Sequence, residues 1–100
     1  MIKLTNTDGR IEFFDINAAG QVVGRWQGAD KGRTGGWLPV QTKGQLPAAS
    51  LLGEVADDGR LCLTISDTKY GELWATWQSQ PGAQMVPWFN LNELLEYLAR

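Results

Sequence analysis

The stretch that decides the fold reads DGRLCLTIS, residues 58–66. Its Asp-Gly pair is a strong hairpin signal, because glycine adopts the positive φ angles that tight turns between strands require. After the turn, Leu61, Leu63 and Ile65 alternate with small or polar residues, which is the period-two pattern of a strand with one buried face. The pattern predicts a hairpin that leads into a half-buried antiparallel strand.

Similar units of turn and strand recur on both sides of this stretch. The pattern predicts strands over residues 2–4, 10–16, 21–27, 60–66, 72–78 and 84–89, with turn residues between them. Residues 45–55 remain open between a short helix and a strand, because Pro47 suits the start of a helix and Gly53 its end. Short strands in this order predict an antiparallel meander.

The last segment has a helical period. Leu91, Leu94, Leu95 and Leu98 stand at i, i+3, i+4 and i+7, which places them on one apolar helix face. Asn90 precedes them and is a good N-cap, since its side chain can accept a hydrogen bond from the first turn. We predict a helix over residues 91–99 that packs this leucine face on the sheet.

Together these elements predict an α+β fold in a single domain, residues 1–100. The expected architecture is an antiparallel, strongly twisted or barrel-like sheet of five to seven strands with one C-terminal amphipathic helix packed on it. A composition of 43% hydrophobic and 20% charged residues is ordinary for one globular domain. The residues expected in the core are Ile11, Phe13, Val22, Leu61, Leu63, Ile65, Leu94, Leu95 and Leu98.

The two halves of the chain resemble each other. The tripeptide Asp-Gly-Arg at residues 8–10 recurs at 58–60, and the pair Trp-Gln at residues 26–27 recurs at 77–78. One interpretation is an internal pseudo-two-fold duplication with halves 1–51 and 52–100. Chance is the alternative, because Asp-Gly turns are common in hairpins and tryptophan is abundant in this chain.

Several kinds of chemistry have no residues to carry them. The chain has no histidine and one cysteine, which excludes histidine-based catalysis and makes a zinc site unexpected. The acidic group of Glu54, Asp57 and Asp58 lies at a turn whose chemistry already explains an aspartate, and Cys62 has no base to activate it. We therefore predict a protein that is not an enzyme, with no catalytic residue, metal site or cofactor.

The same composition indicates where the protein works. A single cysteine cannot form an internal disulfide, and no apolar run has the roughly 20 residues that a membrane-spanning helix needs. The N-terminus lacks the apolar segment of a signal peptide. We expect a cytoplasmic protein without a membrane partner.

Tryptophans and one basic, glycine-rich loop are the candidates for binding. Five tryptophans in 100 residues offer large flat surfaces for a ligand or partner. The loop of residues 28–37 brings Lys31, Arg33 and Trp37 together after Arg25. On the strand over residues 72–78, Trp77 is expected to face the core, so Trp74 should lie under the helix or stand exposed. The candidate binding residues are Arg25, Lys31, Arg33, Trp37 and Trp74.

The segment VPWFNLNELL, residues 86–95, resembles the last strand and the helix start of PC4-like transcriptional coactivators. That family, with the similar Whirly and PUR folds, binds single-stranded nucleic acid on curved sheets. The resemblance covers the second half of the chain and implies a single-stranded nucleic-acid binding protein.

The residues themselves favour a small binding module. We predict first a protein-interaction or inhibitor-type protein with an unknown protein partner, because the chain is nearly neutral, rich in tryptophan and without catalytic equipment. One alternative is single-stranded nucleic-acid binding, and another is a small-molecule or carbohydrate binder with a Trp-lined pocket. A homodimer is a further alternative, since an exposed edge strand can pair with a second copy.

Overall fold

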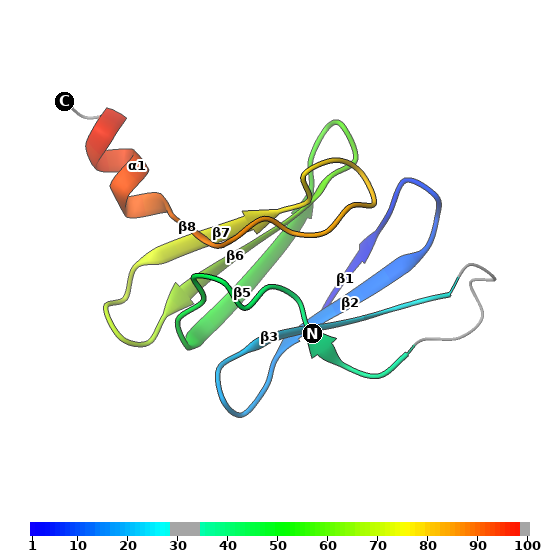
Figure 1. The fold of residues 1–100 in the computed structure, drawn as a ribbon, viewed down its shortest axis with the longest axis horizontal. Helices are drawn as coiled ribbons and strands as arrows, with labels where there is room; N and C mark the ends of the chain where they lie inside the picture. The colour runs from blue at the N-terminus through cyan, green and yellow to red at the C-terminus, as the bar shows by residue number, and fades with distance from the viewer. Residues whose placement is uncertain (29–34, 99–100) are drawn as a thin grey trace.

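The computed structural model describes residues 1–28 and 35–98, of which residues 94–97 are described by their backbone alone. Within these ranges the chain forms two four-stranded antiparallel sheets and one helix (Figure 1). The first sheet contains β1 (Ile2–Thr5), β2 (Ile11–Ile16), β3 (Val22–Trp26) and β4 (Leu38–Pro39). The second contains β5 (Ala48–Val55), β6 (Leu61–Asp67), β7 (Leu73–Trp77) and β8 (Phe89–Asn90), and α1 (Leu91–Leu98) follows.

The protein is therefore mostly β and not α+β. The prediction of one sheet with five to seven strands is wrong, because the chain divides its strands between two open sheets. In each sheet the strands lie side by side in chain order. The first sheet ends at β4, which has only two residues and contains Pro39. So short an edge offers little for a fifth strand to pair with, and proline lacks the N–H that a ladder needs.

Two segments differ from the expected strand pattern. Residues 45–55, left open between helix and strand, form β5 from residue 48 onward. The strand expected over residues 84–89 is interrupted, and only a bridge between Gln78 and Met85 and the short β8 remain. Pro87 lies between these two pairings, and the N–H of Trp88 turns to the carbonyl oxygen of Lys43 at 3.0 Å.

Both Asp-Gly turns form as the sequence predicts. Gly9 and Gly59 have φ angles of 86° and 93°, in the region that only glycine enters without strain. In each turn the backbone N–H two residues after Asp donates to its carboxylate, at 3.0 Å for Asp8 and 3.2 Å for Asp58. The two hairpins are therefore built by the same local hydrogen bonds.

The two sheets share one strand register. A shift of 50 residues turns the pair Ile2 and Phe14 of β1 and β2 into the pair Leu52 and Thr64 of β5 and β6. The shift is 51 residues in the last two strands of each sheet, where Ala75 and Phe89 pair as their counterparts do 51 residues earlier. Each residue of the first sheet thus has a counterpart in the second. The boundary expected at 51/52 falls inside β5.

The core lies between the sheets and receives side chains from both. Its buried members are Leu4, Phe14 and Val22 from the first sheet, Ala48, Leu61, Leu63 and Ile65 from the second, and Met85 and Trp88 from the β7–β8 connection. The core predictions for Val22, Leu61, Leu63 and Ile65 are confirmed. The predictions for Ile11 and Phe13 are wrong, since both side chains are only half-buried.

The register explains the exchange of Phe13 for Phe14. Residues paired across strands share a face, and Phe14 pairs with Gly24 on the face toward the second sheet. Ile11 and Phe13 have the opposite parity and point to the outer face of the first sheet. Sequence alternation identified the strand but not which of its two faces is buried.

The helix does not lie over a face of either sheet. It extends beyond the end of β8, away from both sheets (Figure 1), and its start is tied to β7 by the N–H of Leu73, which donates to Asn92 at 3.0 Å. Leu98 is 67% exposed, so its assignment to the core is wrong, whereas the side chains of Leu94 and Leu95 lie outside the described ones. The N-cap prediction is confirmed, since Asn90 accepts the N–H of Glu93 at 3.0 Å. In the described part of the chain, no helix is long and apolar enough to cross a membrane.

Candidate functional site

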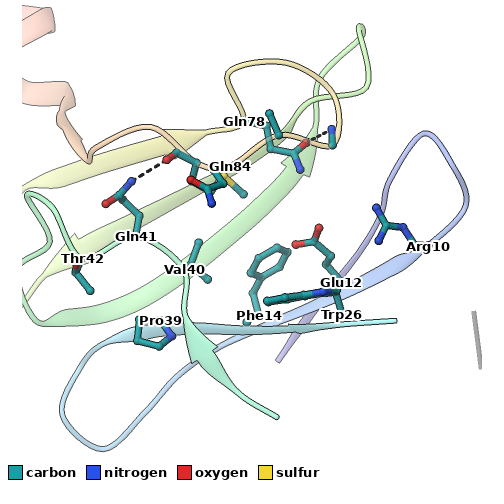
Figure 2. Close-up of a pocket in the computed structure, with 14 residues that line it drawn as sticks. Arg10, Glu12, Phe14, Trp26, Pro39, Val40, Gln41, Thr42, Gln78 and Gln84 are labelled. Atoms are coloured by element: carbon teal, nitrogen blue, oxygen red, sulfur yellow. Dashed lines mark hydrogen bonds between the residues drawn. The ribbon is translucent and has the colours of Figure 1, made fainter. Parts of the chain in front are cut away.

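A cavity of about 500 Å³ lies between the two sheets (Figure 2). Its walls come from β2, β3, the segment after β4 and the connection between β7 and β8. Figure 2 draws its lining residues, which are Arg10, Glu12, Phe14, Gly24, Trp26, Pro39, Val40, Gln41, Thr42, Gln78, Gly82, Ala83, Gln84 and Met85. We call this cavity the intersheet cleft.

The floor of the intersheet cleft is apolar. Phe14 is 1% exposed and lies beside Val40 and Met85 in the core. Gly24 permits this close packing, because a β-carbon on it would stand only 3.0 Å from Cγ2 of Val40 and 3.3 Å from Cδ1 of Phe14. The absence of a side chain at this position lets Val40 and Phe14 approach the backbone of β3.

Trp26 provides an exposed aromatic surface at the cleft. It is the last residue of β3, pairs with Glu12 of β2, and is 44% exposed. Cross-strand partners share a face, so the indole and the carboxylate both belong to the face toward the second sheet. An indole and a carboxylate side by side can contact the apolar and the polar parts of one ligand.

The polar groups of the cleft are held by hydrogen bonds. Asn6 donates to Oε1 of Glu12 at 2.9 Å and accepts from Nε2 of Gln78 at 3.3 Å. Gln78, which is 2% exposed, accepts the N–H of Leu61 at 2.8 Å. Arg10 is paired with Asp8, with Nε 2.6 Å from Oδ2. These contacts fix the side chains that a ligand would meet.

Gln41 connects the two sides of the cleft. Its side-chain Nε2 donates to the backbone carbonyl oxygen of Met85 at 2.7 Å, and its backbone carbonyl oxygen accepts the indole N–H of Trp88 at 2.8 Å. The first of these bonds is drawn in Figure 2. Both bonds join the segment after β4 to the β7–β8 connection, so they set the spacing of the two walls.

The candidate residues expected from sequence do not meet in this cleft. Arg25 lies on the outer face of the first sheet, with its guanidinium 5.6 Å from the centre of the Trp37 ring. Cations and aromatic rings attract each other at this distance, so these two predicted residues are brought together. Lys31 and Arg33 lie outside the described residues.

Trp74 faces the core, which reverses the expected orientation of β7. It packs against the core cluster, and its indole N–H donates to Oδ2 of Asp67 at 2.8 Å. Trp77 points instead to the outer face of the second sheet, where its ring centre lies 6.5 Å from that of Phe89. The reason is again parity, because Thr76 and Gln78 are the buried residues of this segment.

Asp67 organises the turn between β6 and β7. Burial by itself would raise the pKa of its carboxyl, but hydrogen bonds from the N–H groups of Tyr70, Gly71 and Glu72 and from Trp74 outweigh burial and lower the pKa below its ordinary value. The charged carboxylate therefore holds the turn together. This arrangement gives Asp67 a structural role.

The surroundings of Cys62 keep its thiol protonated. Burial raises the pKa of the Cys62 thiol, and the charge of Glu54 raises it further, so the thiolate that a nucleophile needs is disfavoured. The carboxylate of Asp58 is paired with Arg60 at 2.7 Å. Among the described residues, no three potential metal-binding side chains of the types His, Cys, Asp or Glu come together.

Sequence reasoning missed Arg10, Glu12 and Trp26 as members of one site. The recurrence of an Asp-Gly-Arg turn and a Trp-Gln pair was a usable signal, since Arg10 and Trp26 belong to it. The pairing of Trp26 with Glu12 could not be foreseen, because the strands predicted over residues 10–16 and 21–27 leave their register open, and a slip of one residue would place Arg25 opposite Glu12. No protein-family model matches the chain, and no curated protein matches it either.

Proposed function

We propose that this protein binds a small, neutral, polyhydroxylated ligand, such as a mono- or disaccharide, in the intersheet cleft. The observation that carries the proposal is the 44% exposed indole of Trp26 beside an ordered set of carboxylate, guanidinium and amide groups in a cavity of about 500 Å³. This function is the carbohydrate-binding alternative among those that the sequence predicts.

The chemistry of the cleft suits a sugar because a sugar ring has two kinds of surface. Its C–H face is apolar and stacks on an aromatic ring, while its hydroxyl groups form hydrogen bonds at the ring edge. Trp26 supplies the aromatic surface, and Glu12, Gln84 and Arg10 supply acceptors and donors around it. The cavity volume lies within the range of small-molecule sites.

The charges of the cleft support a neutral ligand. Arg10 is paired with Asp8, and Glu12 contributes a negative charge of its own. A nucleic-acid site needs an excess of positive charge to neutralise phosphates, and its affinity falls steeply with salt. The mixed charges here favour a ligand whose binding depends little on ionic strength.

The test is titration with a panel of neutral mono- and disaccharides, followed by tryptophan fluorescence and calorimetry. We expect saturable binding by at least one sugar, unchanged between low and physiological salt. Trp26→Ala should weaken this binding tenfold or more, which corresponds to about 1.4 kcal/mol. Tyr70→Ala is the matched control, since Tyr70 is an exposed aromatic residue in the β6–β7 turn, outside the cleft.

Two results would contradict the proposal. One is the absence of saturable binding by every sugar of the panel, and the other is binding that Trp26→Ala leaves intact. Salt-sensitive binding of a single-stranded oligonucleotide in the place of a sugar would favour the nucleic-acid alternative instead.

A protein-interaction function, the first of the functions predicted from sequence, has support from a different surface. The outer face of the second sheet carries Leu73 and Phe89, which are 44% and 42% exposed, beside Trp77. Exposed apolar groups in one patch are typical of protein interfaces.

A further inference from the structure

The two sheets pack through faces that are not equivalent. The first sheet contributes Leu4, Phe14 and Val22 to the core. The counterparts of these residues in the second sheet are Glu54, Thr64 and Leu73, which follow from the shifts of 50 and 51 residues. Glu54 and Leu73 are exposed, so this face of the second sheet points outward.

The converse holds for the second sheet. It contributes Leu61, Leu63 and Ile65 to the core, and their counterparts Ile11, Phe13 and Asp15 lie on the outer face of the first sheet. The internal contact is thus heterologous, because the two sheets, which share one register, meet through faces that do not correspond to each other. The outer face of each sheet corresponds to the face that the other sheet uses in the internal contact.

Both outer faces carry aromatic side chains, as the internal contact does. On the second sheet, Leu73, Trp77 and Phe89 form an apolar patch. On the first sheet, Trp37 is 38% exposed, whereas its counterpart Trp88 is 5% exposed and bonded across the internal contact. Trp37 therefore occupies, on the outer face of the first sheet, the position at which the second sheet buries Trp88 in the internal contact.

The charges on the two outer faces are complementary. In the internal contact, a β-carbon on Gly53 would lie 3.2 Å from Cδ1 of Leu4, so these two positions face each other. Their counterparts on the outer faces are Lys3 and Glu54, both exposed and of opposite charge. On the strands, the outer face of the first sheet carries Lys3, Arg25 and Asp15, and the outer face of the second sheet carries Glu54. A face with a net positive charge would therefore meet a negative one.

We propose that copies of this chain associate head to tail, with the outer face of the first sheet of one copy packed on the outer face of the second sheet of the next. β1 packs against β5 and both run in the same direction, while the two sheets diverge away from these strands (Figure 1). Wedge-like units of four-stranded sheets that stack in this way close into a ring, as the blades of a β-propeller do.

Ring closure limits the number of copies. Propellers have about four to eight blades, so chains with two sheets each would close with about two to four copies. Closure would cover both outer faces of every copy. It would also create a second kind of cleft, flanked by Arg60 and Trp77, the counterparts of Arg10 and Trp26.

The test is the molar mass in solution, measured by light scattering after size exclusion across a range of concentrations. We expect a discrete mass of two to four times the 11.1 kDa of one chain. A monomer at all soluble concentrations would overturn the proposal, and so would a filament that grows with concentration, because neither is a closed ring.

Single substitutions test the two faces separately. Phe89→Glu introduces a charge into the apolar patch of the second sheet, and Lys3→Glu places a negative charge opposite Glu54 of the next copy. We expect each variant to lower the mass to that of a monomer while circular dichroism stays that of a folded β protein. Tyr70→Glu, at a residue 62% exposed and outside both faces, is the control and should keep the mass of the wild type.

Mixing the two variants distinguishes a head-to-tail contact from a contact between like faces. Each variant retains the face that the other has lost, so the mixture should form a one-to-one dimer and grow no further. If Lys3→Glu retained the mass of the wild type while Phe89→Glu did not, the second sheet would pair with itself and the proposal would be wrong.

Discussion

The contact between the two Asp-Gly hairpins can be tested by adding one carbon atom. Gly59 has a φ angle of 93°, and a β-carbon on it would lie 2.3 Å from Cγ2 of Thr7 in the opposite hairpin. Gly59→Ala should therefore destabilise the protein in two ways. Gly71→Ala provides the control, because Gly71 has a φ angle of 69° but no atom within 4 Å of the added carbon.

The expected magnitude follows from these two terms. An L-residue at a positive φ angle costs about 1–2 kcal/mol, and both variants include this cost. The clash with Thr7 adds about 1–3 kcal/mol, because the threonine must leave its rotamer or the hairpins must move apart. We expect Gly59→Ala to lower the free energy of unfolding by about 2–5 kcal/mol and Gly71→Ala by about 1–2 kcal/mol.

Urea unfolding followed by tryptophan fluorescence measures these differences. Thr7→Ser removes the clashing methyl group, so in the Gly59→Ala background it should restore the stability that the clash had cost. In the Gly71→Ala background it should change the stability little. Equal losses in the two glycine variants, or no recovery by Thr7→Ser, would refute the contact between the hairpins. The arrangement of the two sheets would then need revision.

Three further predictions concern stability and reactivity. Leu63→Ala, in the core, should cost about 2–5 kcal/mol in urea unfolding, while Tyr70→Ala, at an exposed position of the β6–β7 turn, should stay within about 0.5 kcal/mol; equal costs would contradict the burial of Leu63. Because the pKa of Asp67 is lowered on folding, its stabilisation is present above the ordinary carboxyl pKa of 3.8 and is lost as the pH falls through the lower value. The difference in unfolding free energy between wild type and Asp67→Asn should therefore shrink from pH 7 to pH 3, and a difference independent of pH would contradict this role. Because burial and Glu54 raise the pKa of Cys62, iodoacetamide at pH 8 should alkylate Cys62 more slowly than it alkylates the thiol of free glutathione. Glu54→Gln should increase the rate at Cys62, and an unchanged rate would exclude that charge effect.

Local signals in the sequence predicted the elements well where a short segment is sufficient. The Asp-Gly turns, the alternation in β6 and the Asn90 cap each depend on residues within a few positions of one another, and all three are present. Duplication of the chain stays a prediction about its origin, although the two sheets share one register.

The candidate site was less accessible to sequence reasoning. Of the five predicted binding residues, Arg25 and Trp37 lie together on the outer face of the first sheet. Trp74 instead donates its indole N–H to Asp67, and Lys31 and Arg33 lie outside the described residues. The intersheet cleft joins Arg10 and Glu12 to Gln78 and Met85, which are far apart in the chain. Such a set depends on how two sheets meet, and no local pattern encodes that.

The Asp-Gly turns, the strand over residues 60–66 with its buried face, and the N-cap of the helix follow from local sequence, because φ preferences, side-chain alternation and capping act over a few residues. Where a strand carries large apolar side chains on both faces, only the packing of the two sheets decides which face is buried. A period of two is the same for both faces, so Phe13 and Phe14, or Trp74 and Trp77, are equivalent until a second sheet covers one side. That choice buried different faces of two sheets with the same register, and it left the outer faces exposed.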